Sequence, residues 1–172
     1  MRLTTYSDYA LRCLVYLAVQ EHREKLVNIQ DIADVYDISK NHLTKVVHQL
    51  ATIGYIESVR GRNGGIRLAK LAHEINIGEV IRQTETDFSI VECFAPIDKE
   101  VFVTPQKSKN FPAENVAIKE QIQLCKISPA CKLKRVFYEA TQSFLGVLDQ
   151  YTLADMTENE DQLTKLLAIQ KP

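Results

Sequence analysis

Residues 39–54 read SKNHLTKVVHQLATIG, and the rest of the fold can be worked out from this stretch. Its apolar side chains recur at spacings of three and four, which is the period of one face of an α-helix. They are Leu43, Val46, Val47, Leu50 and Ile53. Ser39 stands where a helix N-cap is expected, and Gly54 where a left-handed stop is expected. We therefore predict a helix over residues 40–53 with one buried face.

The opposite face of this predicted helix is polar and free of acidic residues. It carries Lys40, Asn41, Thr44, Lys45, His48, Gln49 and Thr52. A short helix capped by Asn28 comes before it, and Asp37-Ile38 forms a turn between the two. Two helices joined by a turn of a few residues form a helix-turn-helix, whose second helix enters the major groove of DNA. A first amphipathic helix, capped by Ser7 and running to about residue 21, completes the expected apolar core.

A basic hairpin is predicted directly after the helix-turn-helix. Residues 55–59 and 66–69 have strand-like composition, and the tip between them reads RGRNGG, residues 60–65. Its Asn-Gly-Gly sequence supplies residues that tolerate positive φ. Arginine and asparagine side chains on such a tip suit contacts with phosphates or with a minor groove. The predicted fold class is mainly α-helical with a small β-hairpin wing, in which a winged helix-turn-helix forms a DNA-binding lobe.

The distribution of charge indicates DNA binding more clearly than the total charge does. The chain has 21 Lys and Arg against 22 Asp and Glu, a net charge of −1. Residues 40–70 nevertheless carry six basic side chains against the single acid Glu57. Taken alone, this patch is either a solvated charged face or a directed electrostatic surface, and its place on a helix-turn-helix and wing favours the second.

The candidate DNA contacts come from the polar helix face and from the hairpin tip. They are Ser39, Lys40, Asn41 and Lys45 on the helix and Arg60, Arg62 and Asn63 on the hairpin. An asparagine amide suits a bidentate contact with adenine, whereas lysines and wing arginines suit phosphates.

The second half of the chain predicts a loop-rich segment followed by a long helix. Three of the five prolines lie within residues 85–124. Ser128-Pro129 suits a helix start, and the apolar stripe after it continues to about residue 150, a length of over about 30 Å. Because so small a lobe cannot cover such a helix, we expect it to pack against its twin in a homodimer. The expected regions are a DNA-binding domain at 1–84, a cysteine-bearing sensor loop at 85–127, and a dimerisation helix with a tail at 128–172.

Composition excludes a membrane span and gives no sign of an enzyme. The longest apolar run, Cys13–Val19, is far shorter than the roughly 20 residues that cross a bilayer. The N-terminal residues are too polar for a signal peptide, so a cytoplasmic protein is expected. No glycine-rich cofactor loop is present, and no general base lies near the cysteines.

Three of the four cysteines are candidate metal ligands. Cys13 lies in an apolar stretch and reads as a buried core residue. Cys125 and Cys131 flank the expected helix start, where a thiol loses its proton more readily, and Cys93 lies earlier in the loop-rich segment. Three thiolates suit an iron–sulfur cluster with one further ligand or a zinc site with one His or Asp. Spacing alone also leaves open redox-active thiols and no site at all.

Five motifs in the sequence resemble those of a known family. They are Met1–Thr4 with Asp8–Arg12, Val35–His42, Gly54–Leu68, Cys125–Lys134 and Ser143–Asp155. Together they resemble the dimeric winged-helix iron–sulfur repressors that include NsrR and IscR, and above all the nitric-oxide-sensing NsrR branch. The resemblance implies a [2Fe-2S] or [4Fe-4S] cluster, a homodimer on a partly palindromic operator, and loss of DNA affinity when nitric oxide attacks the cluster. It further implies Cys93, Cys125 and Cys131 as ligands, with Asp8 of the other subunit as the fourth.

The sequence departs from this family pattern in two places. Residues 94–124 separate Cys93 from Cys125, where the family has only a few residues. The IscR-like branch uses a histidine beside the cysteines, and no histidine of this chain lies near them. The alternative is the same DNA-binding fold under the control of zinc, of thiol oxidation, or of a cluster that reports iron or redox status.

Overall fold

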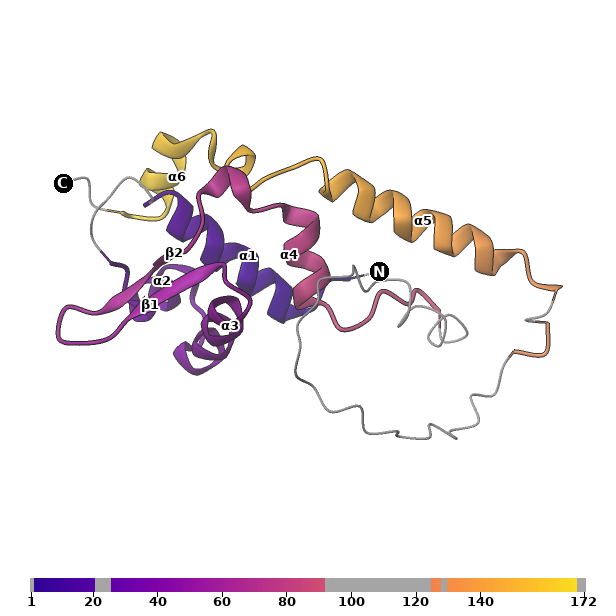
Figure 1. The fold of residues 1–172 in the computed structure, drawn as a ribbon, viewed down its shortest axis with the longest axis horizontal. Helices are drawn as coiled ribbons and strands as arrows, with labels where there is room; N and C mark the ends of the chain where they lie inside the picture. The colour runs from indigo at the N-terminus through magenta and orange to yellow at the C-terminus, as the bar shows by residue number, and fades with distance from the viewer. Residues whose placement is uncertain (1, 21–25, 92–124, 128–129, 170–172) are drawn as a thin grey trace. The chain divides into compact units, whose positions relative to one another are not determined.

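The structure, a computed structural model, describes residues 2–20, 26–91, 125–127 and 130–169. The described part is mainly helical and has one two-stranded sheet, which confirms the predicted fold class (Figure 1). The chain divides into two compact units, residues 1–86 with 144–172, and residues 87–143. No helix among the described residues is long and apolar enough to span a membrane.

Helix α1 (Thr5–Ala18) starts and ends earlier than predicted. The prediction placed its N-cap at Ser7, but Thr4 is the cap, and the Thr4 Oγ1 accepts a hydrogen bond from the Ser7 backbone N–H at 3.3 Å. Both residues are capping types, and the buried position of Ser7 inside the first turn decides between them. Cys13 is fully buried, and burial raises the pKa of its thiol to about 12, which confirms it as a core residue.

Helices α2 (Ile29–Tyr36) and α3 (Lys40–Thr52) form the predicted helix-turn-helix. Asn28 caps α2 by accepting a hydrogen bond from the backbone of Gln30. The turn has Asp37 in the left-handed region at φ 51° and Ile38 buried beside it. Ser39 is at the N-cap of α3, although its side chain makes no capping hydrogen bond.

The wing consists of β1 (Ile56–Val59) and β2 (Gly65–Leu68), paired antiparallel. The Gly64 backbone N–H donates to the Gly61 carbonyl at 3.0 Å and closes the tip. The prediction placed positive φ in the Asn63-Gly64-Gly65 stretch, whereas Gly61 adopts it, at φ 127°. The reason is that the turn closes between Gly61 and Gly64 and so begins earlier than the Asn-Gly sequence indicates.

The C-terminal part returns to the first unit and pairs with the residues ahead of α4 (Ile77–Thr84). The Ile77 backbone N–H donates to the Tyr151 carbonyl at 3.0 Å, and that of Leu153 donates to the Ile75 carbonyl at 2.8 Å. A 3-10 turn (Ala72–Glu74) precedes α4; a second (Asp155–Thr157) and helix α6 (Glu160–Leu166) end the described chain.

Helix α5 (Leu133–Leu148) is shorter than predicted. Its 16 residues span about 24 Å rather than over 30 Å. The predicted start at Ser128-Pro129 lies outside the described residues. The helix ends at Leu148 because the chain then turns to pair with the residues before α4.

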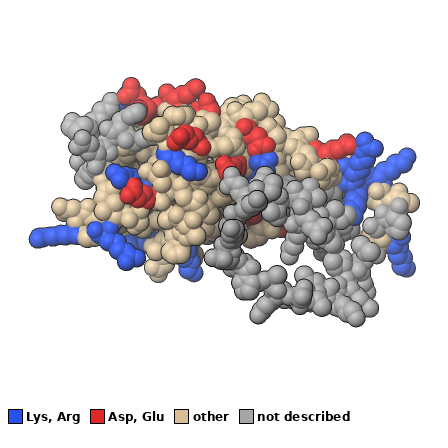
Figure 2. Space-filling view, viewed as in Figure 1, with Lys and Arg blue, Asp and Glu red and all other residues tan. Residues whose placement is uncertain are grey.

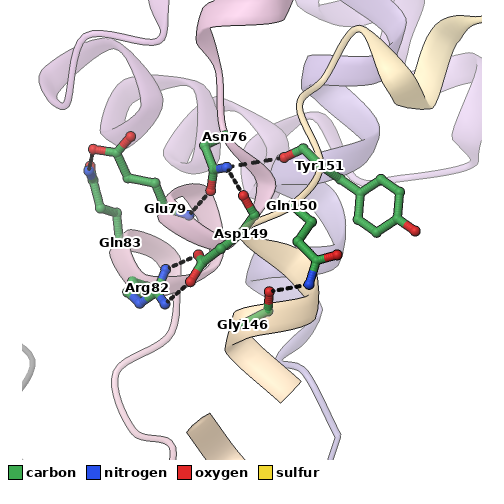
Figure 3. A network of polar contacts seen from close by, with 8 residues as sticks. All are labelled: Asn76, Glu79, Arg82, Gln83, Gly146, Asp149, Gln150 and Tyr151. Atoms are coloured by element: carbon green, nitrogen blue, oxygen red, sulfur yellow. Dashed lines mark hydrogen bonds and ion pairs between the residues drawn. The ribbon is translucent and has the colours of Figure 1, made fainter. Parts of the chain in front are cut away.

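A group of polar contacts holds α4 to the end of α5 (Figure 3). Both terminal guanidinium nitrogens of Arg82 donate to the Asp149 carboxylate, and this lowers the pKa of Asp149 below its ordinary value. The Asn76 amide donates to the Asp149 carbonyl at 2.8 Å. A Cβ on Gly78 would collide with the Asp149 carboxylate, so a larger residue at that position would displace the carboxylate that pairs with Arg82.

Candidate nucleic-acid interface and metal ligands

The exposed face of α3 is the main candidate surface for DNA. Its buried side chains are Leu43, Val46, Val47 and Leu50, as the periodicity predicted, whereas the fifth predicted position, Ile53, is the C-cap and is half-buried. Its exposed residues include the predicted contacts Lys40, Asn41 and Lys45, and Ser39 at the N-cap is exposed as well. The hydroxyls of Thr44 and Thr52 donate to carbonyls of α3 itself, at 2.8 and 2.9 Å. The face therefore presents an amide and two lysines near the start of the helix.

The wing presents the remaining predicted contacts. Arg60, Arg62 and Asn63 are exposed at its tip. Arg67 is exposed too, but its guanidinium pairs with Glu57 across the hairpin at 2.9 Å. In the part of the chain that the structure describes, neither Arg60 nor Arg62 forms a salt bridge. Two cations are thus available to a polyanion at the tip.

Charge of opposite sign gathers on different parts of the first unit. Figure 2 shows Lys and Arg side chains at the hairpin end and along the edge that carries α3, and Asp and Glu side chains over the C-terminal helices. A nearly neutral chain with this uneven distribution can still present a basic surface to a polyanion, and Glu57 on the wing is paired with Arg67.

Asp8 lies in the first turn of α1, at the edge of an open groove of about 510 Å³. Its carboxylate pairs with Arg12 one turn later, at 3.1 Å to Nε and 2.9 Å to Nη2. Arg12 also lies over the ring of Tyr36, 5.7 Å from its centroid. The ion pair uses one site on each carboxylate oxygen and leaves the other sites open to a further ligand.

The thiols of Cys125 and Cys131 lie on either side of a turn that precedes α5. Cys125 is exposed and Cys131 is half-buried, so both are open to a metal. Cys93 lies outside the described residues. Among the residues that are described, no three His, Cys, Asp or Glu side chains lie close enough together to hold a metal. Two accessible thiols and an accessible carboxylate are donors that fit an iron–sulfur cluster, and they also fit zinc.

The family profile of Rrf2, described as an iron-dependent transcriptional regulator, matches residues 3–159. The chain belongs to the Rrf2 family. The HTH-type transcriptional regulator NsrR of Bacillus licheniformis is 49% identical to it, with 98% of this chain and 100% of the relative covered. The same-named regulator of Bacillus subtilis is 46% identical, with 99% and 100% covered. This Rrf2 protein is therefore a DNA-binding transcriptional regulator, which confirms the family and the function class predicted from the sequence.

Solved structures agree on the fold of this Rrf2 protein. CymR (YrzC), titled the global cysteine regulator of B. subtilis, superposes with a TM-score of 0.63 at 23% identity, covering 92% of this chain and 98% of CymR. IscR of T. potens superposes with a TM-score of 0.62 at 23% identity, covering 100% and 93%. At such identities the likeness confirms the winged-helix architecture alone.

Sequence reasoning missed several side chains that hold the reading helix of this Rrf2 protein in place. Gln49 was assigned to the polar face, but its amide donates to the Gln83 carbonyl at the end of α4, at 3.0 Å. Tyr6 donates its hydroxyl to the Lys45 carbonyl at 3.3 Å. Partners so far apart in the sequence leave no local signal, so only the folded chain reveals them.

Proposed function

We propose that the protein is a homodimeric transcriptional repressor whose operator affinity depends on an iron–sulfur cluster that reacts with nitric oxide. The observation that carries the DNA-binding half is the acid-free exposed face of α3 beside a wing with two unpaired arginines. The sensing half is supported by the accessible thiols, by the resemblance to nitric-oxide-sensing repressors, and by relatives named NsrR. Residues 1–84 bind DNA, 85–127 sense the signal and 128–172 dimerise. We propose regulation without catalysis, in the cytoplasm.

Dimerisation is supported by the apolar residues that α5 leaves exposed in the single chain. Leu133 is 58% exposed, and Val136 and Val147 are each 53% exposed. Apolar side chains that repeat along one helix at such exposure mark an interface rather than a solvated face. A second copy of the chain is the occupant that we propose.

Cys93, Cys125 and Cys131 would supply thiolates to the cluster, and Asp8 of the partner subunit would supply a carboxylate oxygen. When bound, the cluster supplies iron that reacts with nitric oxide. Asp8 is on α1, which packs against α3, so a change at this carboxylate reaches the reading helix through one helix contact. Coupling of this kind between a sensor and DNA typically changes affinity about 5- to 150-fold.

Anaerobic reconstitution with iron and sulfide, followed by absorption spectroscopy and operator titration before and after nitric oxide, tests this function. We expect a brown protein that binds its operator tightly and releases it after nitric oxide. Colourless protein that binds zinc, or release that follows thiol oxidation instead, would assign the chain to one of the alternative signals.

Replacing Asp8 by alanine is expected to leave the fold and basal DNA binding intact and to shorten the lifetime of the cluster in air about 10-fold or more. The fold persists because the pair with Arg12 is half-exposed, and exposed pairs contribute at most about 1 kcal/mol. Visible absorbance followed over time measures the lifetime. Glu160→Ala, which removes a first-turn acid from α6, is the control. An unchanged lifetime in Asp8→Ala excludes this ligand.

Replacing Arg62 by alanine is expected to weaken binding to operator and non-operator DNA alike. One phosphate contact fewer lowers the slope of log affinity against log salt by about one unit. Fluorescence anisotropy at several salt concentrations measures both. The control is Lys165→Ala, an exposed base in the last turn of α6. Selective loss of operator binding in Arg62→Ala would show base reading rather than a phosphate contact.

A further inference from the structure

Three side-chain hydrogen bonds connect helices α1, α3 and α4 of the first unit in a closed ring. Glu85, the C-cap of α4, accepts from the Thr4 backbone N–H at 2.7 Å. Tyr6 of α1 donates to the Lys45 carbonyl of α3, and Gln49 of α3 donates to the Gln83 carbonyl of α4. Each bond has a backbone atom at one end, so each fixes the position of a helix and not only of a side chain.

Glu85 also contacts the residue that caps α1. The Thr4 hydroxyl donates to the same Glu85 carboxylate oxygen at 3.0 Å, while its oxygen accepts from the Ser7 N–H as the helix cap. The carboxylate therefore orients the capping hydroxyl and holds the first turn, which contains Tyr6 and Asp8. A displacement of Glu85 would disturb the cap of α1 directly.

The location of Glu85 gives this ring a functional meaning. It is the last residue before the chain leaves α4 for the segment that carries Cys93, and Tyr6 reaches the middle of the helix that we expect to lie on DNA. We propose that Glu85 and Tyr6 are positioning residues: Glu85 ties the entrance of the sensor segment to α1, and Tyr6 ties α1 to α3. The part that concerns the sensor rests on the proposed function, whereas the positioning of α3 does not.

The test compares Glu85→Met, Tyr6→Phe and the double variant with the wild-type full-length chain. Methionine has nearly the length of glutamate but no oxygen that could accept from Thr4, and phenylalanine lacks only the hydroxyl of tyrosine. The DNA probes are a duplex that the wild type selects from a random pool and a shuffled duplex of the same composition. Glu160→Met, the same substitution at an exposed position of α6, is the control. Melting temperature and amide hydrogen exchange are measured on the same samples.

Each single variant is expected to bind the selected duplex about 3- to 10-fold more weakly, since the Tyr6 variant loses one hydrogen bond and the Glu85 variant loses two. Binding to the shuffled duplex should change by less than about twofold. Because the two bonds act in series, the double variant should lose less than the product of the single losses. Amide exchange in α3 should quicken in both single variants. Equal losses on both duplexes, multiplicative losses, or unchanged exchange in α3 would each overturn the proposal.

Failure of the inference is distinguishable from failure of the proposed function. A wild type that selects no duplex contradicts the proposed function, and the hydrogen-exchange comparison then still decides whether Glu85 and Tyr6 hold α3. A wild type that selects a duplex, with variants that behave like it, overturns the positioning roles alone.

Discussion

Replacing Cys131 by serine is expected to remove the iron from anaerobically isolated protein and to lower operator affinity about 5- to 150-fold. Serine has nearly the size of cysteine, but its hydroxyl has no sulfur and does not ionise near neutral pH. It therefore cannot replace the thiolate that binds iron. Cys131 is half-buried just ahead of α5, outside the winged helix, so the fold of the DNA-binding unit should not change. Iron content, visible absorbance and anisotropy titration with operator DNA are the measurements.

Cys13→Ala is the control for this prediction because it removes a buried thiol that is not a candidate metal ligand. Cys13 is fully buried, and burial raises its thiol pKa to about 12, so it stays protonated at neutral pH. Its loss should cost about 1 kcal/mol of folding stability through a small cavity and leave the iron in place. If iron remains in Cys131→Ser, this thiol is not a ligand. If a folded Cys13→Ala also loses its iron, the loss of iron from Cys131→Ser does not identify Cys131 as a ligand.

The helix-turn-helix could be predicted because local chemistry specifies it. The spacing of the apolar side chains from Leu43 to Leu50 sets the buried face of α3. Gly54, just after the helix, has the left-handed conformation that was expected, at φ 84°. Asn28 caps α2 through its own side chain. In each case the residue that decides the structure lies within a few positions of the element that it decides.

The features that sequence reasoning missed depend on residues far apart in the chain. Arg82 of α4 pairs with Asp149, the residue after α5, and Tyr6 of α1 donates to the Lys45 carbonyl of α3. The predicted end of α5, near residue 150, was close to the observed end at Leu148, and the helix is shorter than predicted because it begins at Leu133. Where two capping residues compete, as at the start of α1, burial in the fold decides between them.

The assignment of the metal ligands stays a prediction for a physical reason too. Asp8 is fixed by its own helix and by Arg12, and its exposure could be predicted from its place in a first turn. The thiols depend on the path of the chain between Cys93 and Cys125, which no local pattern specifies, and residues 92–124 lie outside the described part. Measurement of bound iron in variants of these residues therefore decides whether they are ligands.

Replacing Asn41 by alanine is expected to weaken operator binding by about 1–3 kcal/mol, or roughly 5- to 150-fold, while binding to shuffled DNA stays the same. Asn41 is exposed in the first turn of α3, where an amide can donate to and accept from the edge of one adenine. The fold should not suffer, since alanine is the stronger helix former and Asn41 is exposed.

The comparison of Asn41→Ala with Thr52→Ala separates base reading from damage to the helix. Thr52 is exposed at the far end of α3, and its hydroxyl is bonded to the His48 carbonyl, so Thr52→Ala makes a comparable change in the same helix without removing a base contact. Anisotropy titrations with operator and shuffled duplexes give both affinities for each variant. Equal weakening of both duplexes by Asn41→Ala would place this side chain on a phosphate. The sequence would then be read elsewhere on α3, because the wing arginines alone supply affinity without choosing a base.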